Sequence, residues 1–403
     1  MEWTREQKHI VVACFLGWML DAFDFFLMVF ILKDIAKAFA TPISSVALAI
    51  TLTLAMRPVG AVIFGRISDK YGRRPAMMWC VALYSLLELL SGFSPNLLIL
   101  LILRSLFGIA MGGEWGVGAA LTMESIPAKS RGFISGVLQA GYPVGYLLAS
   151  IVFGLFHDSI GWRGMLFVGV LPALLVLYIR SKVVESPASQ QAKESAPKVN
   201  LMASLKQHWK LAIYVILLMT AFNFFSHGTQ DMYPTFLEVQ HHFNTHTVSI
   251  IAIIANLGAI VGAFIFGALS QRIGRRRAIA LAAVLALPIL PLWAYSSTLL
   301  MLAAGGFLMQ VMVQGAWGVV PVHLNELSPP EIRGTFPGVT YQLGNLLAAA
   351  NATIQAGVAQ HYGGNYSLSL VLIAGIFAVV IAILTLFGHE NHGIAMVEQY
   401  SAP

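Results

Sequence analysis

The sequence predicts an all-α membrane protein, with twelve transmembrane helices arranged as two six-helix bundles related by a pseudo-twofold axis. Hydrophobic residues make up 58% of the 403 residues and charged residues only 10%, which is far from the composition of soluble proteins. Twelve apolar stretches approach the length of a helix that crosses a bilayer, which takes roughly 20 residues. Two motifs also recur at one constant spacing, which indicates two related halves.

The expected helices follow one another with short connections. In chain order they cover residues 10–32, 43–66, 76–94, 97–123, 132–156, 164–180, 210–238, 246–269, 278–295, 298–325, 335–361 and 367–387. Arg5 and Lys8 precede the first stretch, but no small-residue cleavage site follows it, so we expect a retained helix and not a removed signal peptide. We expect an N-terminal bundle, a cytoplasmic linker, a C-terminal bundle and a cytoplasmic tail, over residues 1–180, 181–209, 210–387 and 388–403.

The basic residues set the expected orientation. With the N-terminus inside the cell, 19 of the 24 Lys and Arg fall in inner loops and termini, as the positive-inside rule requires. We therefore expect a multi-pass protein of the cytoplasmic membrane, with both termini in the cytoplasm. The net charge of +6 is then a topology signal, and no basic patch interleaved with aromatic residues indicates nucleic-acid binding.

The chain repeats itself at an offset of 202 residues. Gly65–Arg74 (GRISDKYGRR) recurs as Gly267–Arg276 (GALSQRIGRR), and Glu124–Gly132 recurs as Glu326–Gly334. Two independent motifs with one offset indicate two homologous halves, which transporters use as bundles that rock around a site at the membrane midplane.

The first of these motifs, Gly-x-x-x-Asp-Lys-x-Gly-Arg-Arg, resembles the signature of the major facilitator superfamily, and the resemblance covers the whole chain. Its basic groups can pair with carboxylates at neighbouring helix ends. We expect six charged residues to form a gate there: Asp69, Arg73, Glu124, Arg131, Glu326 and Arg333. Gln271 replaces the acid in the second copy, so we expect a weaker charge lock on that side.

Polar residues share one face of the predicted seventh helix. They are Asn223, Ser226, His227, Gln230 and Asp231. An ionisable group inside a membrane span costs on the order of 2.5–3.5 kcal/mol, so such groups usually mark a substrate, ion or proton route. The same cost applies to four residues of the first half: Asp21, Asp24, Arg57 and Glu114. Taken singly, the amides and hydroxyls favour hydrogen bonds that join helices, and only their clustering favours a functional site.

The pattern Asn-x-x-Ser-His-x-Thr-Gln-Asp-x-x-x-Thr over residues 223–235 resembles the signature of the Jen-type monocarboxylate/proton symporters, a branch grouped with the sialate/proton symporters. Residues 18–26, 112–116 and 341–345 also resemble that family. The resemblance implies proton-driven uptake of short monocarboxylates such as lactate or pyruvate. We expect four residues of the seventh helix to bind the substrate, and the resemblance adds two from the eleventh: Asn223, Ser226, His227, Gln230, Tyr341 and Asn345.

Arg57 is the first choice for holding the substrate carboxylate. It lies nine positions from Arg66 at the inner end of its span, which is roughly 13 Å into the membrane. A guanidinium at that depth needs an anionic partner, and its planar fork matches a carboxylate. The alternative is a permanent ion pair with Asp21, Asp24 or Glu114, and both arrangements can alternate.

Proton coupling needs a group whose protonation depends on the side to which the cavity opens. His227 titrates nearest to physiological pH, and Asp231 lies one helical turn further on. We expect this pair to carry the proton, with Glu114, Asp24 and Asp21 as further candidates. The alternative for His227 is a structural role in the core.

Three further expectations complete the interpretation. The nearest rival function is transport of a larger acid, such as sialate or an aromatic acid, and a second rival is a nutrient sensor that does not transport. An enzyme is not expected, because neighbouring residues such as Ser226 and His227 point in different directions along a helix and do not form a catalytic dyad. We expect no cofactor, and a monomer whose partners are a small carboxylate, protons and the lipid bilayer.

Overall fold

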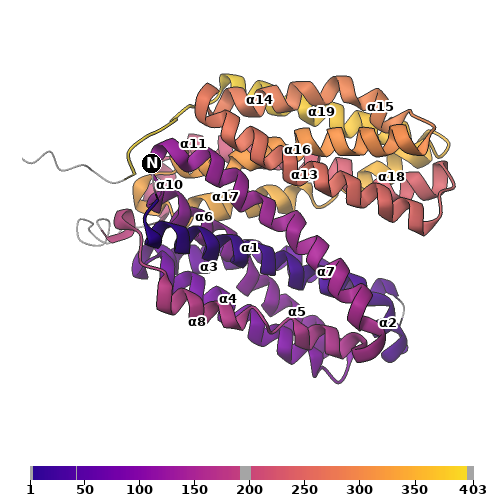
Figure 1. Cartoon of the computed structure of the whole chain (residues 1–403), viewed down its shortest axis with the longest axis horizontal. Coiled ribbons are helices and arrows are strands. Elements are labelled where there is room, and N and C mark those ends of the chain that lie inside the picture. Colours follow the sequence, from indigo (N-terminus) through magenta and orange to yellow (C-terminus); the bar gives the residue numbers. More distant parts are fainter. Residues whose placement is uncertain (1–2, 42, 191–200, 397–403) are drawn as a thin grey trace, which may run out of the picture.

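The computed structural model describes residues 3–41, 43–190 and 201–396, and within them the chain forms helices and no strand. Figure 1 shows two elongated helical bundles that lie against each other. The N-terminus, the α10 segment and the yellow C-terminal segment lie at one end of the molecule. We call this end the linker end and the opposite one the distal end.

The first bundle contains the helices of the N-terminal half. They are α1 (Arg5–Phe30), α2 (Leu32–Ala38), α3 (Ile43–Tyr71), α4 (Arg73–Gly92), α5 (Leu97–Gly112), α6 (Glu114–Ser125), α7 (Arg131–Val168) and α8 (Ala173–Lys182). Gly161 interrupts the long α7 with a φ of 64°, outside helical geometry. One continuous run of 55 residues, Ala128–Lys182, therefore supplies two crossings.

The second bundle repeats this arrangement. Its helices are α10 (Leu201–Gln207), α11 (Trp209–Gln230), α12 (Tyr233–Thr235), α13 (Thr245–Ile273), α14 (Arg275–Ala286), α15 (Leu290–Ala294), α16 (Leu299–Leu327), α17 (Phe336–Ala348), α18 (Asn351–His361) and α19 (Tyr366–Phe387). Ten stretches of the described residues are long and apolar enough to cross a membrane. The eleventh expected helix is divided into α17 and α18, which are each too short to count alone.

Two glycines explain why the repeated motif keeps its spacing. Gly72, between α3 and α4, has a φ of 109°, and Gly274, between α13 and α14, has a φ of 93°. Only glycine adopts such positive φ values without strain. The equivalent turns therefore have the same backbone conformation, and the prediction of an all-α fold with two related bundles is confirmed.

The two bundles pack closely near the linker end. A Cβ atom added to Gly136 of α7 would lie 2.1 Å from the carbonyl oxygen of Ala263 in α13, and one added to Gly116 of α6 would lie 2.7 Å from Cα of Gly338 in α17. Because the backbones approach so closely, no side chain fits between them. The linker end is closed in this structure.

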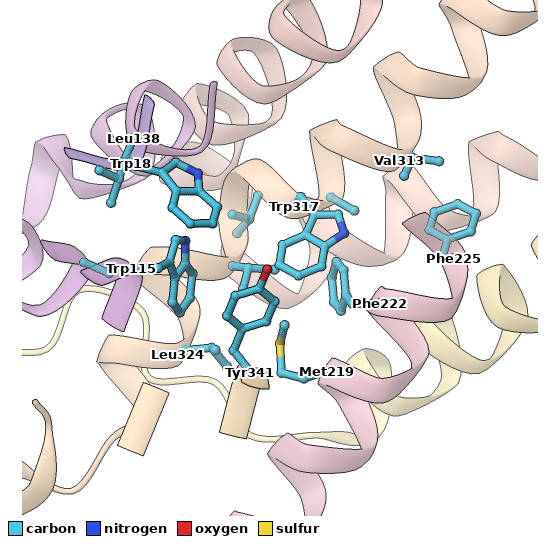
Figure 2. Close-up of a cluster of buried hydrophobic side chains, with 14 of the residues drawn as sticks. Trp18, Trp115, Leu138, Met219, Phe222, Phe225, Val313, Trp317, Leu324 and Tyr341 are labelled. Atoms are coloured by element: carbon cyan, nitrogen blue, oxygen red, sulfur yellow. The ribbon is translucent and has the colours of Figure 1, made fainter. Parts of the chain in front are cut away.

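A row of aromatic side chains continues this closure toward the middle of the molecule. Figure 2 shows Trp18 and Trp115 of the first bundle on one side of Tyr341 and Trp317 of the second bundle on the other. The Tyr341 ring centre lies 4.8 Å from that of Trp115 and 5.4 Å from that of Trp317. These rings join the two halves through apolar contacts.

Candidate functional site

A cavity of about 560 Å³ lies between the two bundles. The N-terminal half contributes Phe25, Phe26, Val29, Leu54, Arg57, Tyr142, Pro143 and Tyr146. The C-terminal half contributes His227, Thr229, Gln230, Asp231, Tyr233, Ala252, Ala255, Asn256, Ala259, Trp293, Gly306, Gln310, Gln314, Tyr341 and Asn345. Tyr341 belongs both to this lining and to the aromatic row, so the row separates the cavity from the linker end.

His227 and Asp231 form the titratable part of the wall. The His227 Nδ1 atom lies 3.1 Å from Oδ1 of Asp231, and its Nε2 atom lies 3.2 Å from Oδ1 of Asn345 in α17. The two side chains of the pair are 37% and 34% exposed. Because the pair is accessible from the cavity, a proton can reach it from there.

The helix that carries this pair ends earlier than expected. We predicted one helix over residues 210–238, but α11 ends at Gln230, with Asp231 as its C-cap residue. A proline lies in the first turn of the short α12, and a π-helical turn follows over Phe236–Gln240. Because proline has no backbone N–H, it interrupts the helical hydrogen bonds, and Asp231 lies at this interruption.

The other residues of the predicted stripe differ in their surroundings. Asn223 is buried and donates to the Met219 carbonyl of its own helix, at 2.8 Å. Ser226 accepts a hydrogen bond from Gln314 at 3.3 Å, and Gln230 donates to Gln310 at 2.9 Å. Of the five residues, His227, Gln230 and Asp231 line the cavity, whereas Asn223 and Ser226 lie behind its surface.

Sequence reasoning missed the glutamines of α16. Gln310 and Gln314 line the cavity and bond to α11 residues. Their spacing of four in an otherwise apolar span places them on one helical face, a signal that was available. The aromatic lining, including Tyr142 and Trp293, carries no comparable signal, because aromatic side chains such as Tyr84 and Phe107 also fill the core of a bundle.

Arg57 lines the cavity from the N-terminal half. Its side chain is 3% exposed, and its Nη2 atom donates to Oδ2 of Asp21 at 3.3 Å. The guanidinium carbon lies 5.9 Å from the centre of the Trp18 ring, within reach of a cation–π attraction. Nε is buried and has no hydrogen-bond partner among the described residues. Arg57 therefore has hydrogen-bonding capacity left for an anionic ligand.

The predicted acids within the spans of the first half, Asp21, Asp24 and Glu114, are buried in its bundle and do not line the cavity. Neither oxygen of Asp24 nor of Glu114 has a hydrogen-bond partner within the described parts of the chain. Both side chains are at most 1% exposed. Close by, Glu88 of α4 and Arg104 of α5 form a fully buried ion pair, which sequence reasoning did not predict.

The first gate motif, as we call Gly65–Arg74, joins the two halves at the linker end. Oδ1 of Asp69 accepts the backbone N–H of Gly334 at 2.8 Å, and Oδ2 accepts the Thr335 hydroxyl at 2.5 Å. Arg73 donates to Asp69 at 3.1 Å and to Glu124 at 2.9 Å. The carboxylate of Asp69 therefore accepts hydrogen bonds from Arg73 in its own half and from Gly334 and Thr335 in the other half.

The second gate motif, Gly267–Arg276, makes the equivalent connection with an amide. Oε1 of Gln271 accepts the backbone N–H of Gly132 at 2.9 Å, and its Nε2 donates to the Ala128 carbonyl at 3.0 Å. Gly132 and Gly334, the two donors, are 202 residues apart. The amide can bond to both a donor and a carbonyl, which a carboxylate cannot do.

The other gate residues form a buried charge cluster between these motifs. Arg275 donates to Glu326 at 2.9 Å, and Arg131 lies 4.0 Å from the same carboxylate. Burial lowers the pKa of Arg333 below its usual value, and the nearby Glu124 carboxylate offsets part of this effect. All six predicted gate residues therefore lie near one another at the linker end, and Arg275 joins them.

Comparison with known proteins gives one consistent picture. Residues 14–244 match the protein family described as "Major Facilitator Superfamily", and residues 199–391 match the family described as "Sugar (and other) transporter". A carboxylic acid transporter protein homolog of Saccharomyces cerevisiae is 32% identical over 92% of this chain, and this chain spans 64% of that protein's length. The sialic acid transporter NanX of Escherichia coli is 30% identical, with 94% of each chain covered.

The fold resembles that of solved transporters. The proton:xylose symporter XylE, bound to 6-bromo-6-deoxy-D-glucose, superposes with a TM-score of 0.79 at 18% identity, with 96% of this chain and 97% of that chain covered.

Proposed function

Because the chain belongs to the major facilitator superfamily, we propose that it imports a short monocarboxylate of the lactate or pyruvate type together with a proton, by alternating access. It is a membrane transporter and not an enzyme. The observation that carries the proposal is a cavity with an under-bonded guanidinium, Arg57, on one wall and a titratable pair, His227 and Asp231, on the other.

The proposed substrate site uses both halves. The carboxylate of the substrate binds Arg57 and competes with Asp21, whose single hydrogen bond to the guanidinium is 3.3 Å long. Gln230, Asn345 and Tyr341 line the facing wall and supply groups for a keto or hydroxyl oxygen. Asn223 and Ser226 support this wall from behind, through contacts within and between helices.

The proposed proton site is the His227–Asp231 pair, with the buried Asp21, Asp24 and Glu114 as further carriers. Moving one monoanion into a negative-inside cell costs about 2.3 kcal/mol per 100 mV, and one accompanying proton cancels that charge. One-to-one symport is then electroneutral, driven by the gradients of pH and substrate.

The proposed orientation places the linker end in the cytoplasm. The basic residues of the two repeated motifs and Lys206 of α10 lie at this end, as expected for the inner side of a cytoplasmic membrane. Residues 1–180 and 210–387 are the two bodies that rock, and 181–209 link them. Since one chain encloses the cavity, a monomer suffices, and in this state the gate toward the cytoplasm is closed.

Uptake into proteoliposomes tests the proposal. With an acidic exterior, labelled lactate should accumulate above its equilibrium level, and a protonophore should abolish the accumulation. His227→Ala should flatten the pH dependence of uptake, whereas His157→Ala, at a partly buried histidine near the distal end, should leave it unchanged. Uptake without accumulation would contradict proton coupling. Absence of counterflow in vesicles that contain folded protein would favour a sensor.

One observation favours a second candidate, a larger organic acid. A cavity of about 560 Å³ falls in the range of sites that enclose ligands much larger than lactate. Its aromatic lining, which includes Phe26, Tyr142 and Trp293, suits an extended apolar or ring-bearing body. The relative NanX is named as a sialic acid transporter. Competition of lactate uptake by pyruvate, sialate and benzoate ranks the two candidates, since the tighter competitor identifies the preferred acid.

A further inference from the structure

A second pocket, outside the transport path, lies at the linker end of the C-terminal bundle. It has a volume of about 430 Å³ and is lined by Arg272, Ile273, Gly274, Arg276, Arg277, Leu386, Glu390 and His392. These residues come from the end of α13, the start of α14, the end of α19 and the segment after α19. The pocket therefore lies where three membrane helices reach the edge of the bilayer.

Two of the charged residues in this pocket are already engaged. The Glu390 carboxylate accepts the backbone N–H groups of Arg275 and Arg276, at 3.2 and 3.1 Å. The Arg276 guanidinium donates to the carbonyl of Thr385 at 2.6 Å and to that of Leu386. These bonds fix the end of α19 against the start of α14 and give the pocket a defined wall.

The other two arginines have no such engagement. Arg272 and Arg277 are exposed, and neither makes an ion pair or a side-chain hydrogen bond with another described residue. His392, also exposed, lies beside them. Since Glu390 is occupied by backbone N–H groups, the pocket presents two guanidinium groups to a ligand. A guanidinium group can bind two oxygens of one phosphate through two parallel hydrogen bonds.

The surface that leads away from the pocket is apolar. Leu281 and Leu285 follow Arg277 at intervals of four on α14, and both are 39% exposed. On α19, Ile383 is 52% exposed and Phe387, which is next to the pocket, is 86% exposed. A basic pocket at the head of two apolar helical faces matches a molecule with an anionic head and hydrocarbon chains.

We propose that this pocket binds the phosphate headgroup of an anionic phospholipid from the leaflet at the linker end, with the acyl chains along the exposed faces of α14 and α19. A free phosphate ion would use the arginines alone and would leave the apolar faces without a role. Basic pockets between membrane helices recognise lipid headgroups by this combination of charge and position.

Native mass spectrometry of the full-length protein tests the site, with phosphatidylglycerol and phosphatidylcholine as probes. The protein should retain phosphatidylglycerol in preference to phosphatidylcholine. Arg272→Gln with Arg277→Gln should weaken this binding roughly thirtyfold, as expected when two surface basic residues are removed. Lys70→Gln with Lys182→Gln is the matched control, because it removes two exposed charges at the linker end of the other bundle.

The outcomes separate the explanations. Equal retention of both lipids, or an equal loss in the control variant, would overturn the proposal. Displacement of phosphatidylglycerol by millimolar inorganic phosphate would identify an ion site in place of a lipid site and would also overturn it. Arg272→Lys with Arg277→Lys keeps both charges and guards against misfolding as the cause. It should lose less affinity than the glutamine variant, and an equal loss would contradict recognition by charge.

Discussion

Replacing Arg57 by lysine tests the centre of the proposed site. The substitution keeps the positive charge opposite Asp21 but removes the planar fork that binds a carboxylate through two parallel hydrogen bonds. Among the described residues, the side chain of Arg57 has one hydrogen bond, to Asp21 at 3.3 Å. The fork is therefore available to a ligand on its cavity side, and the variant isolates its contribution from that of the charge.

The expected magnitude follows from the bond that is lost. A hydrogen bond to a charged group contributes about 1.5–3 kcal/mol, which corresponds to an increase in the Kd for the substrate of roughly 10-fold to 150-fold. Isothermal titration calorimetry on detergent-solubilised protein measures the Kd directly, and the KM for uptake into proteoliposomes should rise in parallel.

Arg104→Lys is the matched control. Arg104 is equally buried, at 1% exposure, and pairs with Glu88, but it does not line the cavity. Its replacement should leave the Kd unchanged, even if the variant unfolds at a lower temperature. An unchanged Kd in folded Arg57→Lys protein would refute the role of Arg57 in carboxylate binding.

Three further predictions concern other parts of the molecule. Asp231→Asn should abolish accumulation driven by a pH gradient while counterflow persists, and unchanged accumulation in vesicles would exclude Asp231 as the proton carrier. Gly136→Ala should open the linker end, because its Cβ would lie 2.1 Å from a carbonyl oxygen of α13, whereas Gly154→Ala, on the same helix with no atom within 4 Å, should not. Labelling of a cysteine introduced at the linker end should rise only in the first variant. Glu88→Gln should lower the stability by about 3–5 kcal/mol, because Arg104 is then buried without its counter-charge, and a thermal melt that does not change would contradict this.

The sequence predicted the features that depend on local chemistry. Span number and helical class follow from the length of apolar stretches, since the bilayer sets that length. The repeated motif was informative because Gly72 and Gly274 occupy backbone conformations that other residues avoid. The positions of Asp69 and Arg73 follow from the first of these turns, which places their charges at one helix end, whereas the role of the six charged residues as a gate stays a prediction.

The features that depend on which helical faces meet were not predictable. Asp24 and Arg57 are equally costly in a membrane, yet only Arg57 lines the cavity. Hydropathy shows that a polar side chain lies within a span. It does not show whether the helical face that carries this side chain borders the cavity or packs inside its own bundle. The Glu88–Arg104 pair shows the same limit, because it joins two helices whose relative rotation is set by the packing of all their neighbours.

The second repeated motif, Gly267–Arg276, makes a connection whose chemistry the sequence did not predict. The expected difference between the two sides was one of charge, because Gln271 stands where Asp69 has a carboxylate. The structure shows that Gln271 crosses to the other half with two hydrogen bonds, one accepted from Gly132 and one donated to Ala128. The amide is thus a different kind of connection, one that pairs with a carbonyl, and its strength relative to the charged side stays a prediction.

The distribution of charge over the two walls has a consequence for the proposed transport cycle. The first half offers the cavity a cation, Arg57, whereas the second half offers amides, such as Gln310 and Asn345, and the titratable pair. In the proposed cycle, the substrate carboxylate binds one of the two bodies while its remaining polar atoms bind the other. Because the two sets of contacts are held by different bodies, both are satisfied only when the halves close around the substrate. Binding thus favours closure, and protonation of His227 or Asp231 changes the charge of only one of the two bodies.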